Sequence, residues 1–145
     1  MAERPTKDGY FTLIAQTTAA RSTCNRLAVG CVLVDSYGNT ISTGYNGSPS
    51  GLPHCLDVGC MIDERTGSCV RTVHAEINAL LRGESHRISG GTAYVTHMPC
   101  WNCFLALASA RVRRVVYLED YRNGDRQRQH GHWFQGGFEL YTGGA

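Results

Sequence analysis

Hydrophobic residues recur at helical spacing in three parts of the chain. Residues that are three or four positions apart share one side of a helix, so each pattern predicts a helix with an apolar face. The predicted faces are Tyr10, Leu13, Ile14 and Thr17 in a first helix that ends near 21–26, Val73, Ile77, Leu80 and Leu81 in a helix over 71–81, and Cys100, Cys103, Phe104 and Leu107 in a helix over 100–110. A polar helix is expected over 123–134.

Strands are predicted where short apolar and β-branched runs lie between turn residues. The run AVGCVLV at 28–34 is apolar throughout, which is typical of a strand covered on both faces. The run at 40–45 follows the turn residues DSYGN, so these two strands should form a hairpin. Further strands are expected at 92–96, 114–118 and 138–141. Because these alternate with helices, residues 1–145 are expected to form a single α/β domain whose later strands are parallel.

A long segment between 46 and 71 has no clear periodicity and is interrupted by glycines and prolines. Loops of more than about 12–15 residues are uncommon in a domain of this size unless they bind something or cover a site. We therefore expect this segment to take part in function.

Composition and charge exclude several classes of function. The chain has 145 residues and a net charge of +2, with no run of Lys or Arg that would bind a nucleic acid polymer. It has no stretch of about 20 apolar residues and no signal-peptide core at its start, so no membrane partner and a cytoplasmic location are expected. In a reducing compartment, seven cysteines indicate metal binding or catalysis before disulfides.

Two helix starts carry unusual polar residues. His74 and Glu76 lie in the first turn of one predicted helix, and Cys100 and Cys103 lie in the first turn of another. A buried imidazole and a buried carboxylate cost free energy unless something pairs with them. If the two helix starts converge, His74, Cys100 and Cys103 offer the nitrogen and sulfur ligands that Zn²⁺ prefers, and the fourth tetrahedral position stays open for water. Glu76 beside that water would serve as a general base and then as a general acid.

Simpler interpretations exist for each part. A single histidine is usually structural, and a lone C-x-x-C pair is often redox-active or structural. A structural, cysteine-rich zinc site is the main alternative to a catalytic centre.

The triplet HAE at 74–76 together with PCWNC at 99–103 is the signature of the zinc-dependent cytidine deaminase superfamily. More closely, the chain resembles the deoxycytidylate (dCMP) deaminase family. The resemblance extends over RSTCNRLAVGCVLV (21–34), STGYNGSPSGLPHC (42–55), CVRTVHAEINAL (69–80) and YVTHMPCWNC (94–103).

The resemblance implies a three-layer α/β/α sandwich with a five-stranded mixed sheet. It also implies zinc-dependent hydrolysis of dCMP to dUMP and ammonia, which supplies dUMP for thymidylate synthesis. Activation by dCTP, inhibition by dTTP, a homohexamer and Mg²⁺ bound with the effector triphosphate belong to the same expectation. The segment 81–91, which is interrupted at Gly83, departs from the family pattern and puts the regulation in doubt, but not the catalysis.

Substrate-binding residues are expected around the predicted zinc site. Arg26 and Arg122 are candidates for the phosphate, because arginine binds phosphate oxygens in bidentate fashion. Asn46 is a candidate for the deoxyribose and Tyr121 for covering the base. The base pocket should be lined by Ala75 and by the strand end at Thr96 and His97. The alternative for each is an ordinary loop residue.

The expected effector site is the glycine-rich turn, whose backbone N–H groups would approach a triphosphate. Its residues are Gly44, Tyr45, Asn46 and Gly47.

The remaining cysteines leave a question open. His54, Cys55, Cys60 and Cys69 either bind a second, structural zinc that holds the long loop or include buried free thiols, and their irregular spacing does not decide between these. Cys24 and Cys31 are interpreted as small core residues.

Two further functions compete with dCMP deamination. One is a deaminase that acts on dCTP, on cytidine or on a base in RNA. The other is a zinc-stabilised module that senses nucleotides without turnover. The buried glutamate argues against it, because a structural zinc site does not need a base.

Overall fold

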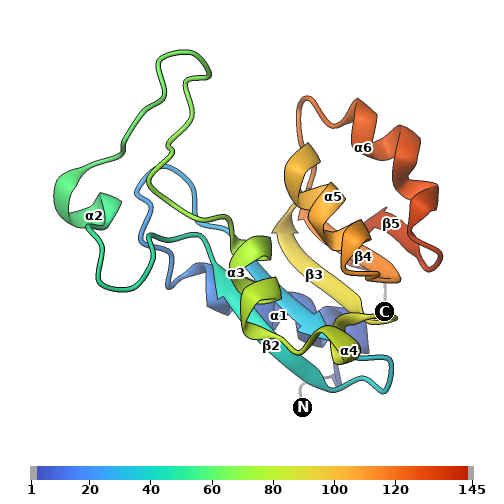
Figure 1. Cartoon of the computed structure of the whole chain (residues 1–145). Coiled ribbons are helices and arrows are strands. Elements are labelled where there is room, and N and C mark those ends of the chain that lie inside the picture. The colour runs from blue at the N-terminus through green and yellow to red at the C-terminus, as the bar shows by residue number, and fades with distance from the viewer. Residues whose placement is uncertain (1–2, 144–145) are drawn as a thin grey trace.

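A five-stranded mixed sheet forms the centre of the computed structural model, which describes residues 3–143 (Figure 1). The strands are β1 (Gly30–Val34), β2 (Thr40–Tyr45), β3 (Thr92–His97), β4 (Arg114–Glu119) and β5 (Gly137–Leu140). The helices are α1 (Lys7–Ala19), α2 (Cys55–Val58), α3 (Ala75–Arg82), α4 (Ser85–Ile88), α5 (Trp101–Ser109) and α6 (Asp125–His130), followed by a 3₁₀ turn at Gly131–Trp133.

The strand order is β2-β1-β3-β4-β5. β1 pairs antiparallel with both β2 and β3, whereas β3, β4 and β5 are parallel to one another. This confirms the predicted hairpin and the parallel pairing of the later strands. The parallel strands require crossovers, which α5 and α6 provide.

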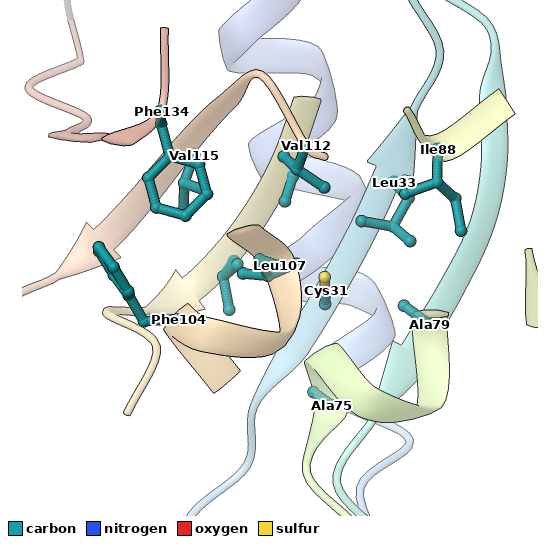
Figure 2. Close-up of a cluster of buried hydrophobic side chains, with 12 residues drawn as sticks. Cys31, Leu33, Ala75, Ala79, Ile88, Phe104, Leu107, Val112, Val115 and Phe134 are labelled. Atoms are coloured by element: carbon teal, nitrogen blue, oxygen red, sulfur yellow. The ribbon is translucent and has the colours of Figure 1, made fainter. Parts of the chain in front are cut away.

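Helices cover both faces of the sheet, as the three-layer prediction requires. Val32 and Val34 of β1 face α1, where they pack with Phe11 and Ala15. The alternate residues of β1 face the other layer, because successive side chains of a strand point to opposite sides. Figure 2 shows this second layer, in which Ala75 and Ala79 of α3, Ile88 of α4 and Phe104 and Leu107 of α5 pack over the sheet.

The predicted apolar faces of α1 and α3 are only partly correct, because Ile14 and Leu80 pack against the core while other members of each face are exposed. Tyr10 and Leu13 are half exposed, and the buried side of α1 consists of Phe11, Thr12, Ala15 and Ala19. In α3 the buried residues are Ala75, Glu76 and Ala79, while Leu81 is 77% exposed. Where each helix comes closest to the sheet, at Ala15 and Ala19 of α1 and at Ala75 and Ala79 of α3, only small residues fit.

Glycines in the strands make this close approach possible. A Cβ atom at Gly30 would overlap the backbone of Ala15 and Ala19, and one at Gly44 would overlap the backbone of Ala75 and Ala79. The two helices therefore dock through backbone contact at glycine and alanine, and their larger apolar residues lie to the side.

Element boundaries differ from the prediction mainly at helix starts. The helix expected over 71–81 begins only at Ala75. His74, the residue just before it, has an extended backbone and is the N-cap position. The polar helix expected over 123–134 is the six-residue α6 followed by the 3₁₀ turn. No helix of the described residues has the length and apolar character needed to cross a membrane.

Residues 46–74, called the arm here, connect β2 to α3 and project from the body of the domain (Figure 1). Backbone bridges join Gly47 to Val73 at the base of the arm and Ile62 to Cys69 further out. The only helix in the arm is the four-residue α2. The arm therefore has little regular structure to hold its conformation.

An ion pair attaches α1 to the sheet and gives a prediction about stability. Asp8 accepts hydrogen bonds from Arg114 at 2.9 and 2.7 Å and from the Tyr94 hydroxyl at 2.7 Å. The hydrogen bonds from Arg114 lower the pKa of Asp8. Because the pair is only partly exposed, Asp8→Asn should lower the free energy of unfolding by about 1–2 kcal/mol at pH 7, as measured by urea denaturation.

The pH dependence of this effect follows from the lowered pKa. An aspartate whose pKa is lower in the folded protein than in the unfolded chain stabilises the fold at any pH above the unfolded-state pKa of about 4. This stabilisation is lost as the pH falls through the pKa of the folded state. The difference between wild type and Asp8→Asn should therefore be constant near neutrality and shrink in acid. A difference that grows as the pH falls would contradict this assignment.

Candidate metal centre and substrate pocket

Two helix starts that are far apart in the sequence meet at one point. His74 caps the N-terminus of α3 and Cys100 caps that of α5, and Cys103 lies one turn into α5. The Nδ1 atom of His74 lies 3.5 Å from Cys100 Sγ and 3.4 Å from Cys103 Sγ. All three ligand atoms lie within 4.8 Å of one another.

These distances fit zinc. Tetrahedral Zn²⁺ with ordinary Zn–N and Zn–S bond lengths places nitrogen and sulfur about 3.5 Å apart. In residues 3–143 no fourth histidine, cysteine or carboxylate joins this group. The donor set therefore suits a catalytic zinc, with three protein ligands and one open position.

The protonation states of these groups also favour metal binding. Hydrogen bonds from Cys103 and His74 lower the pKa of Cys100 to about 4, and the same contact with Cys100 raises the pKa of His74. The hydrogen bond with Cys100 and burial raise the pKa of Cys103 instead, because the Cys103 thiol keeps its proton to donate to the Cys100 thiolate. A zinc ion replaces the shared protons and allows both sulfurs to be thiolates.

Glu76 lies in the first turn of α3 and is only 4% exposed. Burial raises its pKa to about 7. A carboxyl group with this pKa exchanges protons readily at neutral pH, which suits a general base that becomes a general acid. The sequence pattern predicts that the neighbouring imidazole is buried too; this prediction is wrong, because His74 is solvent-exposed.

A cavity of about 380 Å³ opens beside this centre. Its volume lies within the range of small-molecule sites. His74, Glu76 and Cys100 form one part of its wall. Of the predicted substrate residues, the structure places Arg26, Asn46, Ala75 and Tyr121 in the wall as well.

Arg26 and Asn46 hold the loop that enters β1. The Asn46 side chain accepts a hydrogen bond from the Val29 amide at 2.8 Å and donates one to the Leu27 carbonyl at 2.6 Å. Arg26 donates from Nη1 to the carbonyl oxygen of Gly67 in the arm at 3.2 Å. The second amide proton of Asn46 and the remaining guanidinium protons of Arg26 stay available to a ligand.

Thr96 and His97 end strand β3 at the cavity. His97 lines the cavity, whereas Thr96 is buried behind it. The Thr96 hydroxyl accepts from the Gly30 amide at 3.1 Å and lies 2.9 Å from Nδ1 of His97. Nε2 of His97 lies 3.1 Å from Glu119. Thr96 thus orients His97 and is not itself part of the wall.

Arg122 differs from the other predicted residues, since it is exposed and lies outside the cavity wall. Other wall residues were not predicted as substrate residues, among them Leu27, Cys69, Thr72, Met98 and Asp120. Most of these lie in loops without periodicity, so the only available signal was their closeness in sequence to Arg26, His74, His97 and Tyr121.

The backbone groups of the expected effector turn already make hydrogen bonds and packing contacts within the protein. The Asn46 amide donates to the Val29 carbonyl, and the Gly47 amide donates to the Val73 carbonyl. Gly44 packs against the backbone of α3, and the Tyr45 carbonyl accepts from Asn78. Binding of a triphosphate through the N–H groups of Asn46 and Gly47 therefore stays a prediction, and it requires these internal hydrogen bonds to break.

Comparison with known proteins agrees with this geometry. The family described as "cytidine and deoxycytidylate deaminase zinc-binding region" matches residues 5–119. The deoxycytidylate deaminase of Mycobacterium phage D29 is 40% identical over 127 residues, which cover 81% of this chain and 98% of that protein. The crystal structure of the dCMP deaminase from cyanophage S-TIM5 in complex with dCMP and dUMP has a TM-score of 0.78 at 29% identity, covering 97% of this chain and all of that one.

Other relatives are longer than the matched region. ComE operon protein 2 of Bacillus subtilis is 42% identical over 123 residues, and the match spans 83% of this chain and 63% of that protein. The match to the deoxycytidylate deaminase of Saccharomyces cerevisiae, at 37% identity, spans 82% of this chain and 39% of the yeast protein. With its mixed α/β/α fold and the family match over residues 5–119, the chain belongs to the cytidine and deoxycytidylate deaminase family.

Proposed function

We propose that this protein hydrolyses dCMP to dUMP and ammonia. The observation that carries the proposal is the position of Glu76, a buried carboxyl group beside a three-donor zinc group in the wall of a nucleotide-sized cavity. In a purely structural zinc site, a buried carboxyl group that does not bind the metal would cost free energy and serve no function. The named relatives among dCMP deaminases support the same substrate.

Glu76 would move the protons of the reaction. Zinc, when bound by His74, Cys100 and Cys103, supplies the Lewis acidity that activates water at neutral pH. The Glu76 carboxylate accepts a proton from the attacking water and delivers it to N3 of the cytosine. It then transfers the second proton of that water to the amine that leaves from C4, so that one water is consumed and one ammonia is released.

Other residues of the cavity would position the substrate. Arg26 supplies positive charge for the phosphate, and Asn46 offers its remaining amide proton to the deoxyribose. Tyr121 lines the cavity and can cover the base. Because Arg122 lies outside the cavity wall, we assign the phosphate to Arg26.

The substrate can be tested by comparing rates on dCMP, CMP, deoxycytidine, cytidine and dCTP with the zinc-loaded protein. We expect kcat/KM to be highest for dCMP. A preference for an unphosphorylated nucleoside would contradict the role of Arg26, and a preference for dCTP would favour the triphosphate deaminase. Tight nucleotide binding without ammonia release would favour the sensing module.

Arg26→Ala should raise KM for dCMP by about 10- to 100-fold, because one charge-assisted contact with phosphate contributes about 1.5–3 kcal/mol. Its effect on deoxycytidine, which has no phosphate, should be much smaller. The matched control is Arg122→Ala, which removes an equal charge from the exposed turn outside the cavity wall. Equal effects of the two variants on dCMP would overturn the assignment.

Regulation and assembly rest on the family resemblance. We propose dCTP as activator, dTTP as inhibitor, Mg²⁺ bound with the triphosphate, a homohexamer and a cytoplasmic role in supplying dUMP for thymidylate synthesis. The effector residues Gly44, Tyr45, Asn46 and Gly47 remain part of this proposal, although binding there would need the turn to give up internal hydrogen bonds. Rates measured with each effector, together with the solution mass, test these points.

A further inference from the structure

Helix α6 lies beside α5, and its residues contact the turn that leads into that helix (Figure 1). A Cβ atom at Gly124, the N-cap of α6, would lie 2.5 Å from the Met98 sulfur, so these two residues are in close contact. Three positions later, the Gln127 side chain donates a hydrogen bond from Nε2 to the Pro99 carbonyl at 3.1 Å. Residues three positions apart share one face of a helix, so this face of α6 follows the turn.

The same face continues past Cys100 to the next residue. The His130 ring lies 5.6 Å from the ring of Trp101, which is the first residue of α5. The guanidinium carbon of Arg126 lies 5.3 Å from the centre of the Trp101 ring. α6 therefore contacts residues on both sides of Cys100, although the three donors of the candidate zinc group lie on other elements.

We propose that Gln127 is a positioning residue for the metal centre: its hydrogen bond to the Pro99 carbonyl fixes the peptide that leads into Cys100, and with it the direction of the Cys100 sulfur. This peptide is planar, so the Pro99 carbonyl and the Cys100 nitrogen turn together. Cys100 is the extended N-cap of α5, and the N–H group of an N-cap residue takes no part in the helical hydrogen bonds. The helix therefore does not fix this peptide, and the contact with Gln127 does.

Burial makes this hydrogen bond more than a surface contact. Gln127 is only 2% exposed, whereas the other side chains of α6 are exposed or half-buried. A glutamine is mostly found at the surface, because a buried amide costs free energy unless it is hydrogen-bonded. An apolar residue at this position could fill the same space, but it would leave the buried Pro99 carbonyl without this donor.

α6 is itself tied to the turn that precedes it, so it can act as a support. The Arg128 guanidinium donates to Asp120 and to Asp125, each at 2.9 Å, and to the Tyr121 carbonyl at 3.0 Å. Asp120 and Tyr121 line the substrate cavity. The helix thus connects the turn at Cys100 with another part of the cavity wall.

The orientation of Cys100 matters because three protein atoms must surround one ion. Metal–ligand distances tolerate deviations of only about 0.2 Å, so a rotated Cys100 peptide would weaken binding. Residues that orient a metal ligand without touching the metal typically contribute about 10- to 100-fold to metal affinity or activity. The inference rests on the function proposed above only in that zinc binds His74, Cys100 and Cys103.

Zinc affinity tests this role without any measure of turnover. Gln127→Met keeps the approximate length and volume of the side chain and removes the amide. We expect its zinc dissociation constant, measured by competition with a chelator of known affinity, to rise by about 10- to 100-fold. Gln129→Met makes the same substitution at an exposed position of the same helix and should bind zinc as tightly as the wild type. Cys100→Ser removes a ligand and shows which part of the bound zinc belongs to this centre.

Spectroscopy and stability separate positioning from a purely structural role. The absorption spectrum of Co²⁺-substituted Gln127→Met should have weaker or shifted sulfur-to-metal bands, because the Cys100 sulfur is displaced. If Gln127 only held α6 in place, the metal-free protein would lose stability to urea, but zinc affinity and the Co²⁺ spectrum would match those of Gln129→Met. That result would overturn the proposal.

The wild type provides a test that does not depend on the folding of a variant. In its nuclear magnetic resonance spectrum, the side-chain NH₂ signals of Gln127 should exchange slowly with water and should shift when zinc is added. Signals that exchange freely and do not respond to zinc would reject the positioning role, even if Gln127→Met failed to fold.

Kinetics at saturating zinc complete the test. Gln127→Met should lower kcat for dCMP by about tenfold or more and change KM much less, because the metal centre is displaced while Arg26 stays in place. Zinc affinity and kcat both equal to those of the wild type would reject the role of Gln127. A wild-type protein that binds zinc tightly but releases no ammonia would instead reject the proposed function and leave the positioning role standing. A wild type without zinc at His74, Cys100 and Cys103 would overturn both.

Discussion

Glu76→Gln is expected to abolish deamination of dCMP while the catalytic zinc stays bound. Glutamine keeps the size of the side chain but cannot accept and return a proton, so kcat should fall by at least about 10²–10⁴-fold. Because Glu76 is not among the three donor residues, zinc content should not change. Ammonia release and elemental zinc analysis on the same preparation measure both quantities.

A matched control separates chemistry from general effects on the fold. Glu84→Gln makes the same substitution at an exposed residue just beyond α3, where the carboxylate pairs only weakly with His86 at 3.6 Å. It should retain nearly wild-type activity. If Glu76→Gln lost zinc, or turned over dCMP as fast as the control, the role assigned to Glu76 would be wrong.

Gly44→Ala is expected to destabilise the fold strongly. The added methyl group would overlap the carbonyl oxygen of Ala75 and the amide nitrogen of Ala79, and a helix backbone cannot rotate away as a side chain can. Overpacking of this kind costs about 3 kcal/mol of unfolding free energy. Urea denaturation followed by circular dichroism measures the loss.

The same substitution should reduce activity, because α3 carries Glu76 and begins at His74. Any shift of α3 away from β2 moves both residues relative to Cys100. Thr40→Ala, at the exposed start of the same strand, is the control and should cost less than about 1 kcal/mol. An unfolding free energy for Gly44→Ala within 0.5 kcal/mol of wild type, roughly the usual range for surface substitutions, would show that the sheet and α3 are not in rigid contact.

The elements of the fold were largely predictable because local patterns specify them. The apolar run of β1 indicated a strand that is covered on both faces, and every residue of β1 is buried. The predicted stripe of α5 was close to correct, since Cys103, Phe104 and Leu107 are buried there. For α1 and α3 the prediction followed the large apolar residues and was only partly correct, because the closest contacts with the sheet are made by alanines opposite Gly30 and Gly44.

The candidate site was predictable to a similar extent. His74, Cys100 and Cys103 were named as ligands from their places at two helix starts, and the structure brings their ligand atoms together. The choice between Arg26 and Arg122 for the phosphate was not available from sequence. Both are loop arginines, and only the path of the chain places Arg26 in the cavity wall.

The sequence by itself determined which reactive side chains stand at the two helix starts: a histidine and a glutamate two residues apart at one, and a C-x-x-C pair at the other. Such spacings act within one helical turn, so helix geometry alone relates these side chains. Only the tertiary structure decided which helix faces are buried, that the Sγ atom of Cys24 lies within 4.8 Å of those of Cys55 and Cys60, and that the effector turn is internally hydrogen-bonded. The physical reason is that these features depend on contacts between segments far apart in the chain, which no local spacing records.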